Sequence, residues 1–178
     1  MANIVLGVTG SIAAYKACEL TRLFVQADHQ VHVAMTAAAA RFVAPLTFRT
    51  LSQNPAYVDM FDEPAEWMPE HISLAAKADL MVIAPCTANV IAKIAHGLAD
   101  DLLTATALAC KAPLLVVPAM NTAMWENPAT RANVATLESR QIKFVDAGTG
   151  DLACGTSGKG RMAEPGVIFK AALSLLSS

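Results

Sequence analysis

Polar residues follow the ends of several apolar stretches in this sequence, at positions suited to a binding site. The clearest is Asn121, which comes just after the apolar run at 114–118. Such a β-branched run is typical of a buried parallel strand, and its final proline cannot continue the hydrogen-bond ladder. Ligands of open α/β sheets bind at the carboxyl ends of the strands, where Asn121 would lie. The alternative is that Asn121 only caps the helix or turn that follows.

Hydroxyl groups at three further predicted strand ends are suited to binding an anion. Ser11 ends a tight turn and opens the predicted helix 11–27, whose free amides and positive dipole end favour an anion. Thr36 follows the predicted strand 30–35, and Thr87 follows the predicted strand 80–85. The spacing Gly-x-x-Gly-Ser matches neither the dinucleotide GxGxxG motif nor the Walker motif. Simple capped turns therefore remain the alternative.

His71 and Cys154 are candidates for moving protons. His71 follows an acidic, proline-bearing stretch and enters the predicted helix 72–77. The positive end of a helix dipole favours the neutral imidazole, which can act as a base, although a solvated loop histidine is the alternative. Cys154 lies in the segment 148–161, which has glycine at 148, 150, 155, 158 and 160. Long segments with this glycine content often serve as lids or binding flaps.

Alternating strands and helices must position these residues. The pattern predicts strands at 3–7, 30–35, 80–85, 114–118 and 143–146, and helices at 11–27, 37–43, 46–51, 72–77, 87–96, 102–110, 127–139 and 166–176. With right-handed crossovers this order specifies a doubly wound parallel α/β sheet, in a single domain covering residues 1–178. The aromatic residues Phe42, Phe48, Phe61 and Trp67 predict a core or subunit-interface cluster.

Composition limits the partners of this domain. Its 178 residues, 54% hydrophobic and 16% charged, suit one domain with a sizeable core. A net charge of -2 argues against nucleic acid and an anionic membrane as partners. The mean hydropathy of +0.43 is high, yet no window has the roughly 18 unbroken apolar residues of a membrane helix. Burial of apolar surface between identical subunits would explain it.

Cysteine and histidine spacing argues against a metal site. Cys18, Cys86, Cys110 and Cys154 form no CxxC pair, and the histidines form no HxxxH or HxH pair. No metal is predicted. The amino-terminal residues lack the layout of a signal peptide, so we expect reduced thiols and a cytoplasmic location.

Four separated segments together resemble the homo-oligomeric flavin-containing cysteine decarboxylases, and within them the members that serve coenzyme A biosynthesis. They are 10–16 (Gly-Ser-Ile-Ala-Ala-Tyr-Lys), His71, 118–125 (Pro-Ala-Met-Asn-Thr-Ala-Met-Trp), and 153–155 together with 158–162. The family's usual Pro-Ala-Ser/Thr-Ala-Asn-Thr block is similar to residues 85–90, where Cys86 and Val90 depart from it and remove one hydroxyl.

The resemblance implies a Rossmann-like, flavodoxin-like three-layer sandwich that binds FMN at the carboxyl edge of the sheet. By analogy the FMN-binding residues would be Gly10, Ser11, Ile12, Thr36, Ala38, Thr87, Ala88, Asn89, Val90 and Val117. The family forms trimers, often gathered into dodecamers, with flavin at the subunit contact. The sequence leaves open whether a phosphopantothenate–cysteine ligase is fused to this chain or separate from it.

The family's chemistry, carried over by resemblance, assigns roles to the remaining residues. FMN oxidises the substrate cysteine thiol, carbon dioxide leaves, and the resulting enethiol is reduced. His71 would be the base near the thiol, Asn121 would bind the carboxylate, and Cys154 would protonate the enethiol. Met124, Ala153 and Gly155 would contact the small-molecule substrate.

Two alternatives come from the same family. One is a peptidyl-cysteine decarboxylase, which stops at the enethiol and does not need Cys154. The other is a flavin-binding regulatory protein, although such members tend to carry long added tails. A flavin prenyltransferase or a flavodoxin-like electron carrier would lack the combination of His71, Asn121 and Cys154.

Overall fold

The computed structural model describes residues 1–61, 67–151 and 157–177. Its centre is a parallel sheet formed by β1 (Asn3–Val8), β2 (Gln30–Met35), β3 (Ala56–Tyr57), β4 (Leu80–Cys86), β5 (Leu114–Pro118) and β6 (Lys143–Phe144). The spatial order is β3-β2-β1-β4-β5-β6, the 3-2-1-4-5-6 order of the Rossmann fold. Without the short edge strand β3 it becomes the 2-1-3-4-5 order of flavodoxins. The predicted doubly wound fold is confirmed.

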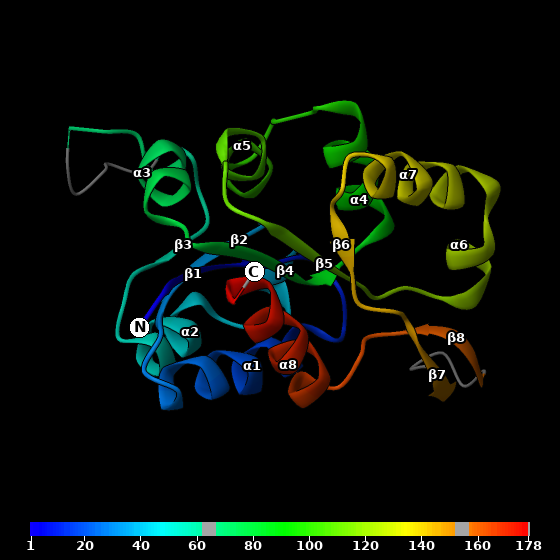
Figure 1. The fold of residues 1–178 in the computed structure, drawn as a ribbon, viewed down its shortest axis with the longest axis horizontal. Helices are drawn as coiled ribbons and strands as arrows, with labels where there is room; N and C mark the ends of the chain where they lie inside the picture. The colour runs from blue at the N-terminus through cyan, green and yellow to red at the C-terminus, as the bar shows by residue number, and fades with distance from the viewer. Residues whose placement is uncertain (62–66, 152–156, 178) are drawn as a thin grey trace.

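Helices cover both faces of this sheet (Figure 1). One face carries α1 (Ala14–Gln26), α2 (Pro45–Ser52) and α8 (Pro165–Leu176), and the other carries α3 (Glu70–Lys77), α4 (Ala88–His96), α5 (Leu102–Ala109) and α7 (Pro128–Ser139). Successive side chains of β1 point to opposite faces, so Ile4 and Leu6 join one core cluster while Val5 joins the other. Burial on both faces explains why the strands are almost continuously apolar.

The switch in strand order lies between β1 and β4. Ligands of doubly wound sheets bind outside the carboxyl ends of the strands at this point. Thr9, Gly10 and Ser11 follow β1 here, and Thr87 follows β4. The fold therefore brings two of the predicted hydroxyl-bearing turns to the same place.

The first helix begins later than predicted. α1 starts at Ala14, and its N-cap residue Ala13 makes no side-chain capping bond. The Ser11 hydroxyl instead accepts a hydrogen bond from the Ala13 amide at 3.2 Å. The prediction that Ser11 caps the helix was wrong, because its hydroxyl stabilises the turn before the helix.

The alanine-rich stretch 37–43 is also less regular than predicted. Only the 3-10 helix η1 (Ala39–Arg41) forms there. Ala44 precedes Pro45 and is extended, with φ -64° and ψ 138°, as expected for a residue whose helical conformation the proline ring disfavours. The segment before it has too few residues to form a stable α-helix. The two-residue strand β3, absent from the prediction, adds a sixth strand beside β2.

The glycine-rich segment 148–161 is not simply a loop. Its described residues form β7 (Gly148–Asp151) and β8 (Ser157–Arg161), an antiparallel hairpin separate from the main sheet. This hairpin could not be predicted from the sequence, because glycines provide no alternation of apolar and polar side chains. The strand predicted at 143–146 is shortened to β6.

The predicted aromatic cluster divides in two. Phe48 on α2 is fully buried, while Phe42, Phe61 and Trp67 are 51%, 87% and 88% exposed. The core interpretation is therefore right for Phe48 and wrong for the other three. Among the described residues, no helix is long and apolar enough to cross a membrane.

Candidate functional site

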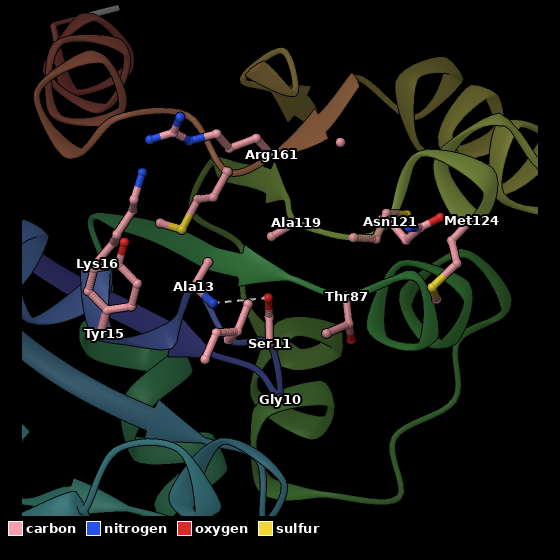
Figure 2. Close-up of a pocket in the computed structure, with 14 residues that line it drawn as sticks. Gly10, Ser11, Ala13, Tyr15, Lys16, Thr87, Ala119, Asn121, Met124 and Arg161 are labelled. Carbon is pink, nitrogen blue, oxygen red and sulfur yellow. Dashed lines mark hydrogen bonds between the residues drawn. The ribbon is translucent and has the colours of Figure 1, made fainter. Parts of the chain in front are cut away.

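A cavity of about 570 Å³ opens at the carboxyl ends of β1, β4 and β5 (Figure 2). Its volume is ordinary for a small-molecule site, which spans roughly 300–1,000 Å³ in proteins. Its walls come from the turn after β1, the start of α1, the segments after β4 and β5, and the hairpin. The lining residues are Gly10, Ser11, Ile12, Ala13, Tyr15, Lys16, Thr87, Ala119, Met120, Asn121, Met124, Gly160, Arg161 and Met162.

The turn after β1 supplies hydrogen-bond donors to this cavity. In the part of the chain that the structure describes, the backbone amides of Gly10 and Ile12 have no hydrogen-bond acceptor. Backbone amides before a helix are suited to binding an anion. Gly10 is also needed for packing, since a Cβ atom there would lie 2.5 Å from the Cβ of Ala38. Any side chain at position 10 would push the segment after β2 away.

Thr87, in the turn after β4, also lines this cavity. Its side chain accepts a hydrogen bond from the Val90 amide at 3.4 Å and caps α4. Burial raises the pKa of the neighbouring Cys86 thiol well above its ordinary value, because the thiolate would lose its hydration. Cys86 is fully buried and does not line the cavity, so its departure from the family pattern removes a hydroxyl without adding a thiol to the site.

Asn121 caps a helix, and it also lies at the cavity. Its Oδ1 accepts a hydrogen bond from the Ala123 amide at 2.8 Å, which caps the short helix α6 (Thr122–Glu126). Asn121 also lines the cavity, as does Met124 on the same helix. Because the cap uses the amide oxygen, it fixes Nδ2 as the donor end of the side chain. Trp125, 6% exposed, anchors α6, and the Arg131 guanidinium stacks over its ring at 4.7 Å.

The hairpin approaches the segment after β5 through its glycines. The Met120 amide donates to the Gly160 carbonyl at 2.9 Å. Gly160 has φ +134°, and a Cβ there would collide with the Met120 carbonyl oxygen. A Cβ at Gly158 would collide with the Thr122 hydroxyl. Glycine at these positions thus lets β8 form part of the cavity wall.

Three charged residues lie beside the cavity. Lys16 Nζ and Arg161 Nη2 both contact Oε1 of Glu164, at 2.9 Å and 3.0 Å. The Lys16 side chain is only 9% exposed, whereas that of Glu164 is 59% exposed. The hydrogen bond from Lys16, together with the charges of Lys16 and Arg161, lowers the pKa of Glu164. Two cations share one carboxylate here, so this end of the cavity is net positive.

The structure brings many of the predicted site residues together. Gly10, Ser11, Ile12, Thr87, Asn121 and Met124 line the cavity. Ala38 contacts Gly10 from behind, and the Thr36 hydroxyl accepts from the Ala39 amide at 3.2 Å. Val90 is behind Thr87 in the first turn of α4, with Ala88 and Asn89 beside it, and none of the three lines the cavity. The Val117 side chain is fully buried in the core.

Two groups of predicted residues are not brought to the cavity. Ala153, Cys154 and Gly155 lie outside the described residues. His71 is in the first turn of α3, which packs against α5 and β1 at the opposite end of the molecule from the hairpin (Figure 1). It does not line the cavity. Its Nδ1 is buried without a hydrogen-bond partner among the described residues.

Several lining residues were not predicted: Ala13, Tyr15, Lys16, Ala119, Met120, Gly160, Arg161 and Met162. Lys16 carried a usable signal, because in the predicted helix 11–27 it would lie one turn after Ile12 and share its face. The others depend on contacts between distant segments. Among the described residues, no group of three or more His, Cys, Asp or Glu side chains is arranged to hold a metal ion.

Comparison with known proteins gives a consistent result. A family model described as Flavoprotein matches residues 1–177. The coenzyme A biosynthesis bifunctional protein CoaBC of Bacillus subtilis is 49% identical over 170 residues, covering 96% of this chain and 42% of that protein. CoaBC of Haemophilus influenzae is 46% identical over 169 residues, covering 95% and 42%. The chain thus spans about two fifths of the length of these relatives.

Solved structures match over the full length. A mutant PPC decarboxylase complexed with pantothenoylaminoethenethiol has a TM-score of 0.89 and 34% identity, with 99% of both chains covered. The FMN binding protein AtHal3 has a TM-score of 0.84 and 35% identity, with 97% of this chain and 95% of that one covered. The FMN-dependent cysteine decarboxylase SpaF has a TM-score of 0.86 and 29% identity, with 100% and 98% covered.

Proposed function

Because this chain belongs to the Flavoprotein family, we propose that it is an FMN-dependent carboxy-lyase, a carbon–carbon lyase acting on 4'-phosphopantothenoylcysteine. The product is 4'-phosphopantetheine, an intermediate of coenzyme A biosynthesis. The observation that carries the proposal is the convergence of Ser11, Thr87 and Asn121 on one cavity. Relatives named for coenzyme A biosynthesis are 46–49% identical to this chain, and a PPC decarboxylase structure matches it end to end.

The cavity suits FMN. The free amides of Gly10 and Ile12, with the hydroxyls of Ser11 and Thr87, provide donors for a phosphate. The methyl, methylene and thioether groups along the rest of the wall suit a planar aromatic ring. Direct FMN contacts from Thr36, Ala38, Ala88, Asn89, Val90 and Val117 remain part of the proposal.

Bound FMN would supply a two-electron acceptor for the substrate cysteine and return the electrons after decarboxylation. Asn121 would hold the substrate carboxylate through its amide donor. A neutral donor suits this task, because a cation would stabilise the charged ground state and so oppose loss of carbon dioxide. The cap to Ala123 keeps that donor oriented, and Met124 would line the substrate site. Ala153 and Gly155 would complete it.

His71 and Cys154 are assigned the proton transfers. A neutral imidazole at position 71 would take the proton from the substrate thiol. Cys154 would protonate the enethiol, which completes the reaction to the thiol. This last step separates the proposal from a peptidyl-cysteine decarboxylase. The greater identity to the CoaBC proteins than to the cysteine decarboxylase SpaF also favours the small-molecule substrate.

The proposal includes a homo-oligomer, as a trimer or dodecamer, in which His71 of one subunit serves the cavity of a neighbour. Its support is that His71 is remote from its own cavity, with Nδ1 buried and unpaired among the described residues. Phe61 and Trp67, both nearly fully exposed, precede the same helix and provide apolar surface for a contact.

Mixing two inactive variants tests this arrangement. If His71→Asn and Asn121→Ala are combined in one oligomer, some cavities receive both native residues, and decarboxylation should return. Each variant assembled alone is the control and should stay inactive. Sedimentation of a monomer at micromolar concentration with FMN bound would instead overturn the oligomer.

The remaining parts of the proposal concern context. The relatives are named as bifunctional, and this chain matches 42% of their length, which suits a flavoprotein domain spanning residues 1–178 that works with a fused or separate phosphopantothenate–cysteine ligase. The scattered cysteines suit a reducing cytoplasm.

Anaerobic single-turnover mixing with 4'-phosphopantothenoylcysteine tests the reaction. Wild type should carry flavin absorbance, release carbon dioxide and form the thiol. His71→Asn should bind FMN but leave it unreduced. Cys154→Ser should release carbon dioxide and accumulate an enethiol two hydrogens lighter than the product, because an alcohol is too weak an acid for the last step. Normal turnover by Cys154→Ser would show that Cys154 is not the proton donor of the last step.

A further inference from the structure

Behind the cavity lies a hydroxyl group that the proposed function does not use. Thr9 is fully buried at the end of β1 and does not line the cavity. Its Oγ1 donates a hydrogen bond to the Pro85 carbonyl at 2.8 Å and accepts one from the Thr87 amide at 3.0 Å. One side chain thus uses both its donor and an acceptor on the same short turn after β4.

The local sheet geometry explains why a side chain is needed here. The parallel register of β1 and β4 ends with the pair Gly7 and Ile83. Beyond it, Pro85 has no N–H to donate to β1, and the register of β4 with β5 is irregular between Ile83 and Cys86. The Thr9 amide donates to the Pro85 carbonyl at 3.3 Å. The hydroxyl adds a second hydrogen bond to the Pro85 carbonyl and gives the Thr87 amide an acceptor, beyond the point where the register of β1 and β4 ends.

Thr9 stands between the two donor-bearing turns of the cavity. Gly10 and Ser11 follow it directly, while the Thr87 residue that it binds presents a hydroxyl to the same cavity. We infer that Thr9 is a positioning residue, whose buried hydroxyl fixes the turn after β1 relative to the turn after β4 so that their donors face one ligand. The part concerning FMN rests on the proposed function, but the part concerning Thr87 does not.

Thr9→Val and Thr9→Ser separate the hydroxyl from the shape of the side chain. Valine keeps the volume but can neither donate to Pro85 nor accept from Thr87, whereas serine keeps both bonds. In Thr9→Val the Thr87 amide should exchange its hydrogen roughly tenfold faster, and FMN affinity should fall roughly tenfold, in line with losing a buried hydrogen bond. Thr9→Ser should restore both.

Thr106→Val is a matched control. Thr106 is also fully buried, and its Oγ1 donates to the Leu102 carbonyl within α5 at 2.7 Å. It does not line the cavity. This variant should lower the thermal midpoint about as much as Thr9→Val, yet leave FMN affinity and Thr87 exchange unchanged.

Two measurements on the purified protein decide the matter: equilibrium dialysis against FMN, and amide hydrogen exchange at Thr87 with saturating FMN and without added FMN. Thr9→Val and Thr106→Val weakening FMN equally would overturn the inference, since both effects would then reflect stability alone. So would unchanged exchange at Thr87 in Thr9→Val. If wild type binds no FMN, the proposed function fails, and the exchange rates at Thr87 still decide the role of Thr9.

Discussion

The cavity has two walls that are held in different ways. The strand-end wall is formed by residues 10–12 and 87, with Thr9 and Ala38 behind it, and the hairpin wall is formed by residues 160–162. In the strand-end wall, the fully buried Thr9 joins two turns and Gly10 packs directly on Ala38. The hairpin wall rests on a backbone bond from Met120 to Gly160 and on ion pairs through the exposed Glu164.

This difference suggests that the two walls serve different steps, one the binding of the cofactor and the other the binding of the substrate. Buried hydrogen bonds and close packing hold donors at fixed positions, which favours a cofactor that stays bound. Surface ion pairs are weak and tolerate small shifts, which suits a wall that adjusts to a substrate. We expect changes in the strand-end wall to alter FMN binding and changes in the hairpin wall to alter turnover.

The largest expected effect is that of Gly10→Ala. Its methyl group would lie 2.5 Å from the Ala38 Cβ, so the turn after β1 and the segment after β2 must separate. Overpacking of this kind costs about 1–3 kcal/mol in unfolding free energy. FMN occupancy of the purified protein, measured by absorbance, should fall roughly tenfold or more, because the amides of Gly10 and Ile12 would shift relative to the Thr87 hydroxyl.

Ala38→Gly in the same chain is the rescue for this variant. It removes the Cβ that Gly10→Ala would meet, leaving backbone atoms at 3.3 Å and 3.5 Å. FMN occupancy should then recover most of the way. No recovery in the double variant would mean that residue 10 acts on the ligand directly rather than through Ala38.

Gly160→Ala changes the hairpin wall and should have an effect of intermediate size on the rate of carbon dioxide release. The residue has φ +134° and its Cβ would collide with the Met120 carbonyl, so about 1–3 kcal/mol of local strain is expected. The rate of carbon dioxide release should fall roughly tenfold, while FMN affinity stays close to that of wild type. Gly166→Ala, where an added Cβ meets nothing within 4 Å, should leave both unchanged. A parallel loss of FMN and turnover in Gly160→Ala would remove the distinction between the walls.

Glu164→Gln should have the smallest effect, and the effect should depend on pH. Lys16, together with Arg161, lowers the pKa of Glu164, so the ion pairs stabilise the fold at neutral pH and are lost as pH falls through that lowered pKa. Since Glu164 is mostly exposed, the difference should be at most about 1 kcal/mol, or roughly 2–4 °C in Tm.

Thermal scans of wild type and Glu164→Gln at neutral pH and near pH 3 measure this difference. Wild type should be the more stable at neutral pH, and the two should converge in acid. Glu138→Gln, at an exposed position on α7 with no ion pair to a described residue, is the control. A gap that persists in acid would show that the pair with Lys16 is not its source.

Local sequence patterns were enough to predict most strands and helices and several residues of the strand-end wall. Apolar runs at 80–85 and 114–118 predicted β4 and β5 because strands buried on both faces need continuous apolar residues. Thr87 as the cap of α4 and Asn121 as a cap at a strand end depend only on neighbours along the chain. Parallel strands place their carboxyl ends at one edge, so Ser11, Thr87 and Asn121 could be grouped from sequence alone.

The contacts between residues far apart in the sequence could be seen only in the tertiary structure. Lys16 and Glu164 are separated by 148 residues, and Thr9 and Pro85 by 76. The periodicity of apolar residues does not predict such contacts, because they depend on how helices and turns pack against the sheet. The same reason explains the hairpin, whose glycines gave no strand signal, and the distance of His71 from its own cavity, since α3 docks on the far end of the sheet through α5 and β1.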